Sequence, residues 1–342
     1  MKTKEFLHYL PYLSLSKLWN LALLLCSYSY SRWSKKALHL GMPSSISVEP
    51  TTACNLKCPE CPSGLRKFTR STGNLKSDFF KQAIDQLSDR LISLTFYFQG
   101  EPYINPEFTE MVHYAHDRKI YTMTSTNAHF LDDENCRKTI ESGLDKLIIS
   151  LDGTTQEIYE QYRVAGDINK VIEGTKRMIR WKQKLKSKTP YLVFQFLVVK
   201  PNEHQIHDVQ ELAKSLGVDD VYLKTAQIYD YNHGSDLIPE QEIYSRYKKQ
   251  SDGTYRIKNK LLNQCWRMWQ GCVISWDGKI VPCCFDKDAE HKLGDLAHDE
   301  FKKIWRSPEY DKFRSAILRG RDQIDICTNC TEGTKVWAAN ES

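Results

Sequence analysis

The strongest constraint on the fold is a regular alternation of apolar runs with amphipathic helical segments that starts at residue 44. Six runs have the composition of β-strands: residues 45–49, 93–98, 120–126, 146–151, 191–199 and 221–226. Several are almost continuously apolar and rich in Val, Ile and Phe, which is typical of parallel strands buried on both faces. Six strands are two short of a complete (β/α)8 barrel. The sequence therefore predicts an α/β fold, a partial (β/α)6 TIM-like barrel over residues 44–229.

Helix signals occupy the stretches between these runs. The expected helices begin near Ser77, Asn105, Asp132, Ile168 and Asn202, and glycines follow the third and the fifth at Gly143 and Gly217. Ser, Asn and Asp are favoured at the start of a helix, and glycine commonly follows its end. The polar, Tyr-rich residues 230–264 have no clear period, so we interpret them as a bridge to a second unit.

Residues 1–43 form an apolar and basic helical segment. Residues 18–30 are apolar, and the basic residues around them are Lys2, Lys4, Lys17, Arg32, Lys35 and Lys36. The apolar run is too short to span a bilayer, which takes about 20 residues, and no small-residue cleavage site follows it cleanly. Two interpretations stay open. One is a helix packed on the barrel; the other is a helix lying at a membrane surface, with Trp19 and Trp33 at its flanks.

The eleven cysteines are unevenly distributed. Cys54, Cys58 and Cys61 form one group, and Cys265, Cys272, Cys283, Cys284, Cys327 and Cys330 form a second. A disulfide framework is typical of short secreted chains, whereas tight cysteine groups in a chain of 342 residues indicate metal ligands. We therefore expect a reducing, cytoplasmic location, with membrane association if the first segment lies on a bilayer.

The first group has the spacing Cys-x3-Cys-x2-Cys and directly follows the first expected strand. Active sites of barrel enzymes lie at this carboxyl end of the strands. Thiolates are soft ligands suited to iron–sulfur clusters, and three of them leave one iron of a four-iron cluster free to bind a small molecule. Structural zinc is the alternative, but it usually needs a fourth ligand, and no Cys or His lies close by in the sequence.

This motif, in this position, resembles the signature of the radical S-adenosylmethionine (SAM) superfamily. The resemblance covers residues 44–226 and implies that Cys54, Cys58 and Cys61 hold a [4Fe-4S] cluster whose open iron binds SAM. It also implies reductive cleavage of SAM and hydrogen abstraction from a substrate, with the hard chemistry supplied by the cofactors. One departure is Glu60, which precedes the third cysteine where the family often has an aromatic residue that touches the adenine.

A second element, Gly100-Glu101-Pro102, follows the second strand and resembles the Gly-Gly-Glu-Pro element that binds the SAM amino group. A carboxylate is a strong acceptor for an ammonium group. By the same resemblance, polar residues at the strand ends are expected to contact SAM: Ser125, Asn127, Ser150, Asp152, Gln195 and Thr225. Arg163 is expected either to pair with the SAM carboxylate or to form a surface ion pair. For Asp152, the alternative to a SAM contact is that it shapes the turn before Gly153.

The second cysteine group reads Cys265-x17-Cys283 and Cys327-x2-Cys330, around a hairpin with its turn at Asp277–Gly278 and a helix near residues 301–305. The pattern resembles the SPASM/twitch auxiliary-cluster domain, here over residues 265–335. This implies one auxiliary [4Fe-4S] cluster held by those four cysteines. Cys284 is expected to point away from Cys283, as neighbours on a strand do, and Cys272 is expected to be a small buried hydrophobe. Zinc is again the alternative.

Composition narrows the function classes. A hydrophobic content of 41% and a net charge of +5 are ordinary for a globular enzyme, and no nucleic-acid-binding module is visible. The resemblance implies a radical SAM oxidoreductase or modifying enzyme that receives electrons from a donor such as flavodoxin or ferredoxin. Its substrate stays open between a peptide or protein, a sugar-like alcohol and an envelope precursor, and no catalytic residue is assigned. About forty residues before the first strand are too few for a leader-binding domain. A non-catalytic iron–sulfur electron carrier is the second hypothesis.

Overall fold

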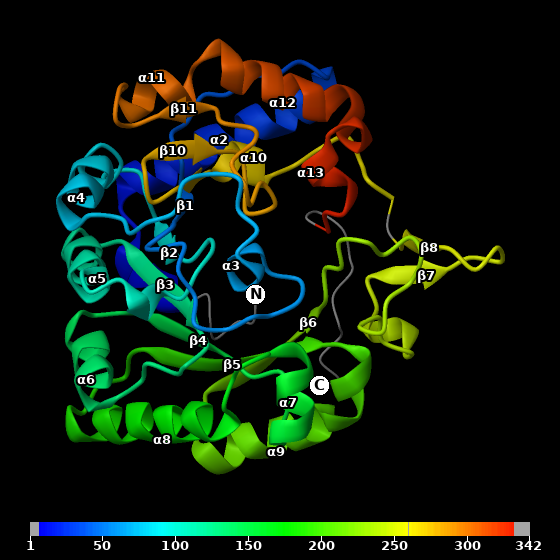
Figure 1. Ribbon diagram of the computed structural model, residues 1–342. Coiled ribbons are helices and arrows are strands. Elements are labelled where there is room, and N and C mark those ends of the chain that lie inside the picture. Colours follow the sequence, from blue (N-terminus) through cyan, green and yellow to red (C-terminus); the bar gives the residue numbers. More distant parts are fainter. Residues whose placement is uncertain (1–6, 259, 332–342) are drawn as a thin grey trace.

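Six parallel strands in sequence order form the centre of the molecule in a computed structural model, which describes residues 7–258 and 260–331 (Figure 1). The strands are β1 (Ser45–Val48), β2 (Ser93–Phe96), β3 (Tyr121–Thr126), β4 (Lys146–Ser150), β5 (Tyr191–Val198) and β6 (Asp220–Thr225). All five neighbouring pairs are parallel. The expected partial six-stranded barrel is therefore confirmed, and each strand lies within two residues of its predicted start.

Side chains on the outer face of the sheet form the main hydrophobic core. Ile46, Leu94, Phe96, Leu147 and Ile149 are buried there beneath the helices. Alternate residues face inwards and are less buried, as the patterns of β1 and β5 indicate. The expectation that the strands are buried on both faces is therefore wrong for the inner face, because that face lines cavities rather than a packed core.

Helices α4 (Ser77–Asp85), α5 (Phe108–Asp117), α6 (Asp133–Glu141), α7 (Gln156–Tyr162), α8 (Ile168–Lys184) and α9 (Ile206–Leu216) follow the strands and cover the outside of the sheet (Figure 1). Asp132 caps α6 as expected, since its side chain accepts a hydrogen bond from the backbone N–H of Asn135. Gly143 and Gly217 follow α6 and α9 with φ of +77° and +82°, a conformation that glycine adopts without strain.

Three expected helix starts are displaced. Ser77 is the first residue of α4 rather than its cap, and the Glu107 carboxylate accepts its backbone N–H at 2.6 Å. Asn105 lies three residues before α5, because the short helix η2 (Pro102–Ile104) precedes it. Asn202 lies in the 3-10 helix η3 (Lys200–Gln205), so α9 begins four residues later than expected.

The carboxyl-terminal part continues the barrel sheet instead of forming a separate layer. Strand β9 (Val273–Ile274) pairs in parallel with β1, and β10 (Lys279–Val281) pairs antiparallel with β9, which confirms the predicted hairpin. Strand β11 (Gly294–Asp295) completes a nine-stranded sheet. Around this sheet lie α10 (Arg267–Gln270), the expected α11 (Phe301–Trp305), α12 (Pro308–Gly320), η5 (Arg321–Gln323) and α13 (Asp325–Thr328). The long helix α12 was not predicted.

Residues 230–264 contain more structure than their composition suggests. They include η4 (Glu242–Tyr244) and a second hairpin of β7 (Tyr247–Lys249) and β8 (Tyr255–Ile257). The Tyr247 ring stacks on that of Tyr231 at 4.5 Å. The four domain boundaries given above stay predictions, and residues 1–6 and 332–335 of the outer two domains lie outside the described part of the chain.

The amino-terminal segment forms η1 (Leu10–Tyr12) and the 20-residue helix α2 (Leu15–Ser34). It contacts the loops that enter β2 and β3: Arg90 donates to the carbonyl of Ser16, and Lys17 donates to the carbonyl of Lys119 at 2.5 Å. Helix α2 therefore packs across the amino-terminal end of the barrel, opposite the expected active site. Among the described residues, no helix combines the length and apolarity needed to cross a membrane.

Candidate active site

The three cysteines of the first group lie on the loop after β1 and line one cavity of about 300 Å³, which we call the carboxyl-end cavity. Cys61 stands at the start of the one-turn helix α3 (Pro62–Leu65), and its backbone N–H donates to the carbonyl of Cys58 at 3.2 Å. The turn is tight, because a Cβ on Gly64 would lie 2.7 Å from the Cys58 nitrogen. The fold thus gathers the three thiols at the carboxyl ends of the strands.

The chemistry of these thiols fits an iron–sulfur cluster. Burial raises the pKa of the Cys54 thiol to about 12 and raises that of Cys58, which Arg163 opposes. N–H groups of Asn127 and Arg163 point at the Cys54 and Cys58 sulfurs, at 4.0 and 3.8 Å. A buried thiol loses its proton when a cation takes its place, and nearby N–H donors stabilise the resulting thiolate. Three thiols held on one loop suit a four-iron cluster with one open iron.

The Gly100-Glu101-Pro102 segment fits tightly against the cysteine loop. Gly100 has φ of +74°, and a Cβ there would lie 2.2 Å from the carbonyl oxygen of Thr51. The backbone N–H of Glu101 donates to the carbonyl of Ala53 at 2.8 Å. The loop after β2 therefore holds the residue next to Cys54 in place. Pro102 opens the short helix η2 and does not line the cavity, so it shapes the loop instead of contacting a ligand.

Glu101 is the most constrained acid of the site. Its side chain is 2% exposed and accepts hydrogen bonds from the Thr126 hydroxyl and the Asn127 backbone N–H, both at 2.7 Å. Burial raises the pKa of Glu101 to about 7, although those hydrogen bonds lower it. A carboxylate in this position would gain from a cationic group in the cavity, which would restore its charged form.

Eight of the ten expected SAM contacts line the carboxyl-end cavity: Gly100, Glu101, Ser125, Asn127, Ser150, Arg163, Gln195 and Thr225. The hydroxyls of Ser125 and Ser150 are 3.4 Å apart at the ends of β3 and β4. The exceptions are Pro102 and Asp152. Asp152, expected to contact SAM or to shape a turn, does not line the cavity, because its carboxylate is fully buried beside the backbone of β5, where it accepts the Leu197 N–H at 2.7 Å.

Arg163 and Asp152 form a buried ion pair rather than a surface one. The Arg163 Nε lies 2.5 Å from the Asp152 Oδ2, and the same guanidinium reaches the Cys58 sulfur. Burial lowers the pKa of Arg163, but Asp152 and Cys58 outweigh this and hold it above its usual range. Asp152 therefore fixes a permanent cation beside the first cysteine group.

Glu60 also lines the cavity, and its carboxylate accepts the backbone N–H of Tyr229 at 2.9 Å. Its pKa is raised by burial. Glu60, which replaces the aromatic residue common in the family, thus connects the cysteine loop to the segment after β6. The residue that contacts adenine stays unassigned.

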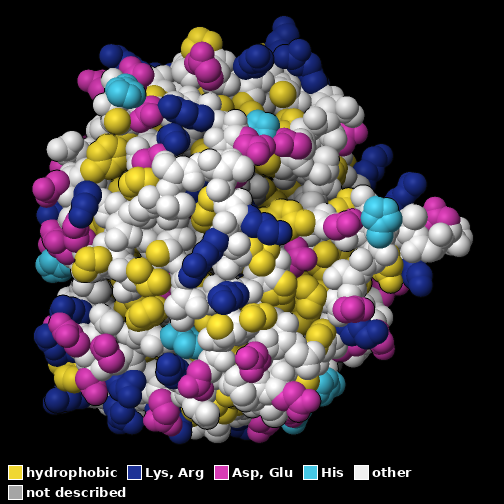
Figure 2. Space-filling model, viewed as in Figure 1, with side chains coloured by type: hydrophobic (Ala, Val, Ile, Leu, Met, Phe, Trp, Pro, Cys, Tyr) yellow, Lys and Arg dark blue, Asp and Glu magenta, His cyan; other side chains and the backbone are white. Residues whose placement is uncertain are grey.

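Several lining residues were missed at the sequence level: Tyr97, Lys224, Gln227, Arg246, Cys284, Phe285 and Lys287. Lys224 could have been found, because it immediately precedes Thr225 on the last barrel strand. Tyr97 and Gln227 closely follow β2 and β6 and could have been found in the same way. The remaining four lie after the barrel, and their position depends on how that part of the chain folds back. Figure 2 views this face of the molecule and shows apolar, Lys and Arg side chains around its centre.

The second cysteine group surrounds a buried guanidinium. The Arg321 Nη2 donates to the Cys330 sulfur at 3.2 Å. Burial lowers the pKa of Arg321, but the nearby Cys265, Cys330 and Cys327 outweigh this and raise it. Burial raises the pKa of Cys283 well above its ordinary value, and Cys265 and Cys330 lie close enough to contribute. Cys265, Cys327 and Cys330 therefore lie near Arg321, and Cys283 lies near Cys265 and Cys330; their assignment as cluster ligands stays a prediction.

Cys272 and Cys284 take other positions. Cys272 is buried in the main hydrophobic core. Cys284 lines the carboxyl-end cavity, while its neighbour Cys283 lines a different cavity and lies near Cys265 and Cys330. Across residues 7–258 and 260–331, no three His, Cys, Asp or Glu side chains come close enough together to hold a single metal ion.

Arg246 connects the carboxyl-end cavity to the second cysteine group by hydrogen bonds. Its guanidinium donates to the carbonyl of Thr225, at the cavity, and to the carbonyl of Asn329, between Cys327 and Cys330. Asn329 is fixed in turn, because its side chain contacts the Tyr247 hydroxyl at 2.9 Å. Arg246, Asn329 and Tyr247 thus lie between the carboxyl-end cavity and the second cysteine group.

Comparison with known proteins agrees with this geometry. The Radical SAM superfamily matches residues 48–216, and the chain is a radical SAM superfamily enzyme, with SAM and a [4Fe-4S] cluster as its cofactors. An iron-sulfur cluster-binding domain, SPASM, matches residues 265–331. The enzyme thus carries a C-terminal SPASM domain with auxiliary iron–sulfur chemistry. The carrier hypothesis is set aside.

Relatives align with most of this chain at low identity. A "Tungsten-containing aldehyde ferredoxin oxidoreductase cofactor-modifying protein" of Pyrococcus furiosus is 24% identical over 314 residues, 83% of this chain and 86% of that protein. The "Antilisterial bacteriocin subtilosin biosynthesis protein AlbA" of Bacillus subtilis is 23% identical over 291 residues, 80% of this chain and 62% of the relative. The structure of BtrN in complex with AdoMet and 2-DOIA superimposes with a TM-score of 0.54 at 18% identity, covering 88% of this chain and 98% of BtrN, and shares the fold.

Proposed function

We propose that this enzyme abstracts a hydrogen atom from its substrate in the carboxyl-end cavity and that the SPASM domain then accepts an electron, so that the substrate is oxidised. The main support for this proposal is that one cavity borders both cysteine groups. Cys54, Cys58 and Cys61 line it together with Cys284. The preceding residue, Cys283, lies near Cys265 and Cys330 of the second group. A substrate in this cavity would lie between the two redox sites.

In this proposal Cys54, Cys58 and Cys61 hold the [4Fe-4S] cluster, and Glu101 accepts a hydrogen bond from the SAM amino group. The bound cluster supplies the electron that cleaves SAM to the 5′-deoxyadenosyl radical. The eight lining residues position SAM, with Ser150 at its ribose, and the buried Arg163 keeps a cation beside Cys58. The protein contributes orientation and exclusion of water, and the cofactors contribute the chemistry.

A single auxiliary [4Fe-4S] cluster held by Cys265, Cys283, Cys327 and Cys330 accounts for the net oxidation. The substrate gives one hydrogen atom to the radical, and the remaining substrate radical loses one electron to the auxiliary site and one proton to solvent. Four thiolates fill every ligand position of a four-iron cluster, which suits electron transfer rather than substrate binding. An external one-electron donor such as flavodoxin or ferredoxin supplies the electron for SAM cleavage.

The cavity wall favours a substrate that carries an anionic group. Lys224 and Lys287 both line it, and Lys224 has no hydrogen-bond or ion-pair partner among the described residues. The Lys287 ammonium lies 4.6 Å from the centre of the Tyr229 ring. Ammonium groups in a partly enclosed cleft attract anions. A peptide or protein, a sugar-like alcohol and an envelope precursor can each carry such a group.

The proposal is tested by measuring 5′-deoxyadenosine from SAM with the anaerobically reconstituted, reduced protein. We expect product from the wild type and none from Cys54→Ala. The auxiliary site is tested by iron content: Cys283→Ala should lose about four irons per chain, while the matched control Cys272→Ala should keep them. Full iron content in Cys283→Ala would overturn the ligand assignment. Product formation by Cys54→Ala would overturn the assignment of the first site.

A further inference from the structure

Helix α2 has its polar residues inside and its apolar residues outside. Its buried residues are polar with one exception, Leu24: the others are Lys17, Asn20, Ser27 and Ser31. The reverse pattern is the rule for a helix on the surface of a globular protein, where the apolar stripe faces the core. The orientation of α2 therefore needs a separate explanation.

Specific hydrogen bonds hold α2 in this orientation. The Asn20 side chain makes two bonds with the Met42 backbone, both at 2.8 Å. The Ser31 hydroxyl both accepts from the Leu38 N–H and donates to the Leu38 carbonyl. Buried polar groups are costly without partners, so rotating the helix to hide its apolar face would break these bonds. The outward face is thus fixed by the fold.

That outward face is a continuous apolar stripe, which we call the α2 face. Its large exposed members are Leu15, Leu18, Trp19, Leu25, Tyr30 and Trp33. The exposed Ala22 and Cys26 lie between them on the same side of the helix. Leu15, Trp19 and Trp33 have 86%, 64% and 82% of their surface exposed. Single exposed apolar residues are common, but a contiguous stripe with two tryptophans marks an interaction surface.

The charged side chains of the segment that carries the stripe are all basic. No Asp or Glu occurs between Phe6 and Val48, whereas Arg32, Lys35 and Lys36 follow one another at the carboxyl end of α2 and are exposed. Trp and apolar residues beside Lys and Arg are the composition of helices that lie in a membrane interface. A second copy on the same face would bring two basic clusters together, which is unfavourable.

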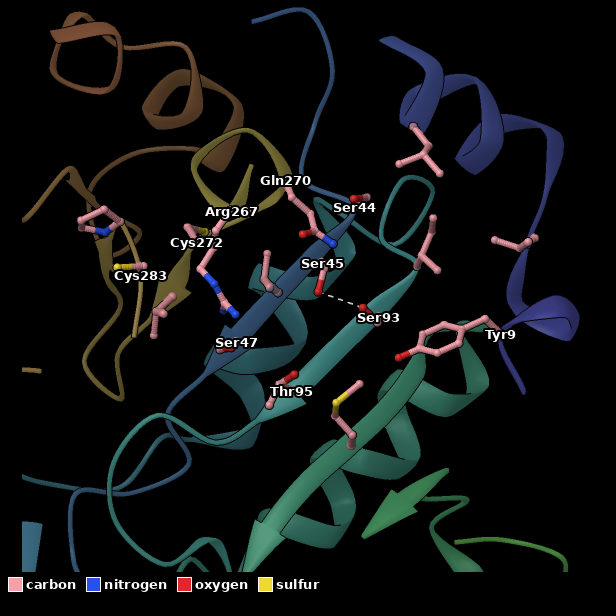
Figure 3. Close-up of a pocket in the computed structure, with 18 of the residues that line it drawn as sticks. Tyr9, Ser44, Ser45, Ser47, Ser93, Thr95, Arg267, Gln270, Cys272 and Cys283 are labelled. Atoms are coloured by element: carbon pink, nitrogen blue, oxygen red, sulfur yellow. Dashed lines mark hydrogen bonds between the residues drawn. The ribbon is translucent and has the colours of Figure 1, made fainter. Parts of the chain in front are cut away.

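An apolar cavity adjoins the α2 face. Leu18 belongs to the stripe and also lines a cavity of about 540 Å³, together with Leu13 and Leu21. Figure 3 shows this amino-end cavity between the strand residues Ser45 and Ser93 and the amino-terminal segment. The volume is in the range of small-molecule sites. Polar residues such as Ser45, Arg267 and Cys283 also line it, but the leucines of the amino-terminal segment suit a hydrocarbon chain. A lipid offers such a chain, which a flat protein partner does not.

We propose that the α2 face docks this enzyme on an anionic phospholipid membrane, with the amino-end cavity facing the bilayer. Leu15, Trp19 and Trp33 enter the headgroup boundary, and Arg32, Lys35 and Lys36 contact anionic headgroups. The active site then faces away from the membrane, because α2 lies at the amino-terminal end of the barrel. This docking is independent of SAM cleavage and goes beyond the proposed reaction.

The test is sedimentation of the full-length reconstituted enzyme with phosphatidylcholine vesicles, with and without phosphatidylglycerol. We expect binding mainly to the anionic vesicles. Lys35→Glu with Lys36→Glu should weaken it about fivefold for each charge lost, since one basic residue near an anionic surface contributes about 1 kcal/mol. Leu15→Glu with Trp19→Glu should weaken it more than about tenfold. These positions are exposed, so the fold should survive.

Ile243→Glu with Leu262→Glu is the matched control, because both residues are exposed and apolar but lie outside the α2 face. It should bind vesicles like the wild type. Failure of the wild type to bind anionic vesicles would overturn the proposal, as would equal loss in the control. A dimer in gel filtration that Leu15→Glu with Trp19→Glu dissociates, without vesicle binding, would assign the face to a second copy instead.

Discussion

Replacement of Glu101 by Gln tests the proposed contact with the SAM amino group with little change in side-chain shape. The Gln carbonyl can accept the Asn127 backbone N–H now taken by the carboxylate, and its amide can donate to the Thr126 hydroxyl. These two partners stay satisfied, and only the long 3.4 Å bond from the Tyr103 backbone N–H is lost, so the fold should persist. What is lost is the negative charge available to the SAM amino group.

The size of the effect follows from the type of bond. A hydrogen bond to a charged group contributes about 1.5–3 kcal/mol, so the Kd for SAM should rise roughly tenfold to hundredfold. Because the pKa of Glu101 is raised to about 7, wild-type affinity should also fall as the pH drops below 7 and the carboxylate is protonated. The variant should lack this pH dependence, since its amide does not titrate.

Folding stability without SAM should show the opposite trend. The pKa of Glu101 in the folded chain lies above its ordinary 4.5, so the folded state binds more protons between the two values. The neutral carboxyl stabilises the fold fully at low pH, and this contribution is lost as the pH rises through 7. Glu101→Gln should remove that loss and melt at the same temperature as the wild type or higher above pH 7.

Equilibrium dialysis with labelled SAM between pH 5.5 and 8 measures the affinity, and thermal melts across the same range measure the stability. Glu134→Gln, at an exposed site, is the control and should leave both unchanged. An unchanged Kd in Glu101→Gln, together with a flat pH profile in the wild type, would refute the assignment of Glu101 to the SAM amino group.

Three further predictions follow from the site. Cys284→Ala should retain all the iron that Cys283→Ala loses, measured by iron analysis, because the two neighbours face different cavities; equal iron loss would contradict this. Asp152→Asn should destabilise the protein by about 3–5 kcal/mol in denaturant titrations, because it leaves the buried Arg163 unpaired; an unchanged midpoint would count against a structural pair. Gly100→Ala should reduce 5′-deoxyadenosine formation strongly, because its Cβ would meet a carbonyl oxygen at 2.2 Å and displace the cysteine loop; wild-type rates would show that this loop tolerates displacement.

Local sequence patterns were enough to predict the barrel strands and the β9–β10 hairpin. Each strand has its own apolar run, and the hairpin has a turn in which Gly278 adopts φ of +85°. Helix starts were less accurate. Ser77 is a good capping residue by type, but the carboxylate of Glu107, 30 positions away, performs this role. A capping residue that is distant in the sequence cannot be recognised from the local sequence pattern.

The candidate site was predictable where its residues follow their own strands, as Glu101 and Ser150 do. Lining residues such as Arg246 and Lys287 could not be placed, because their position depends on the pairing of β9 with β1, across more than two hundred residues. Likewise, alternation predicted that Cys283 and Cys284 diverge, but not which of them faces the cavity. Tertiary folding decides that choice.

The continuous sheet has a consequence for any attempt to divide the chain. Strand β1, which leads into the cysteine loop, has β2 on one side and β9 on the other. Cutting the chain after residue 229 would remove β9 and expose the polar backbone of β1 as a free edge. Free edges recruit other strands and promote aggregation. The SPASM domain is therefore a stabilising flank of the barrel as well as a cluster-binding domain, and we expect the barrel to be unstable without it.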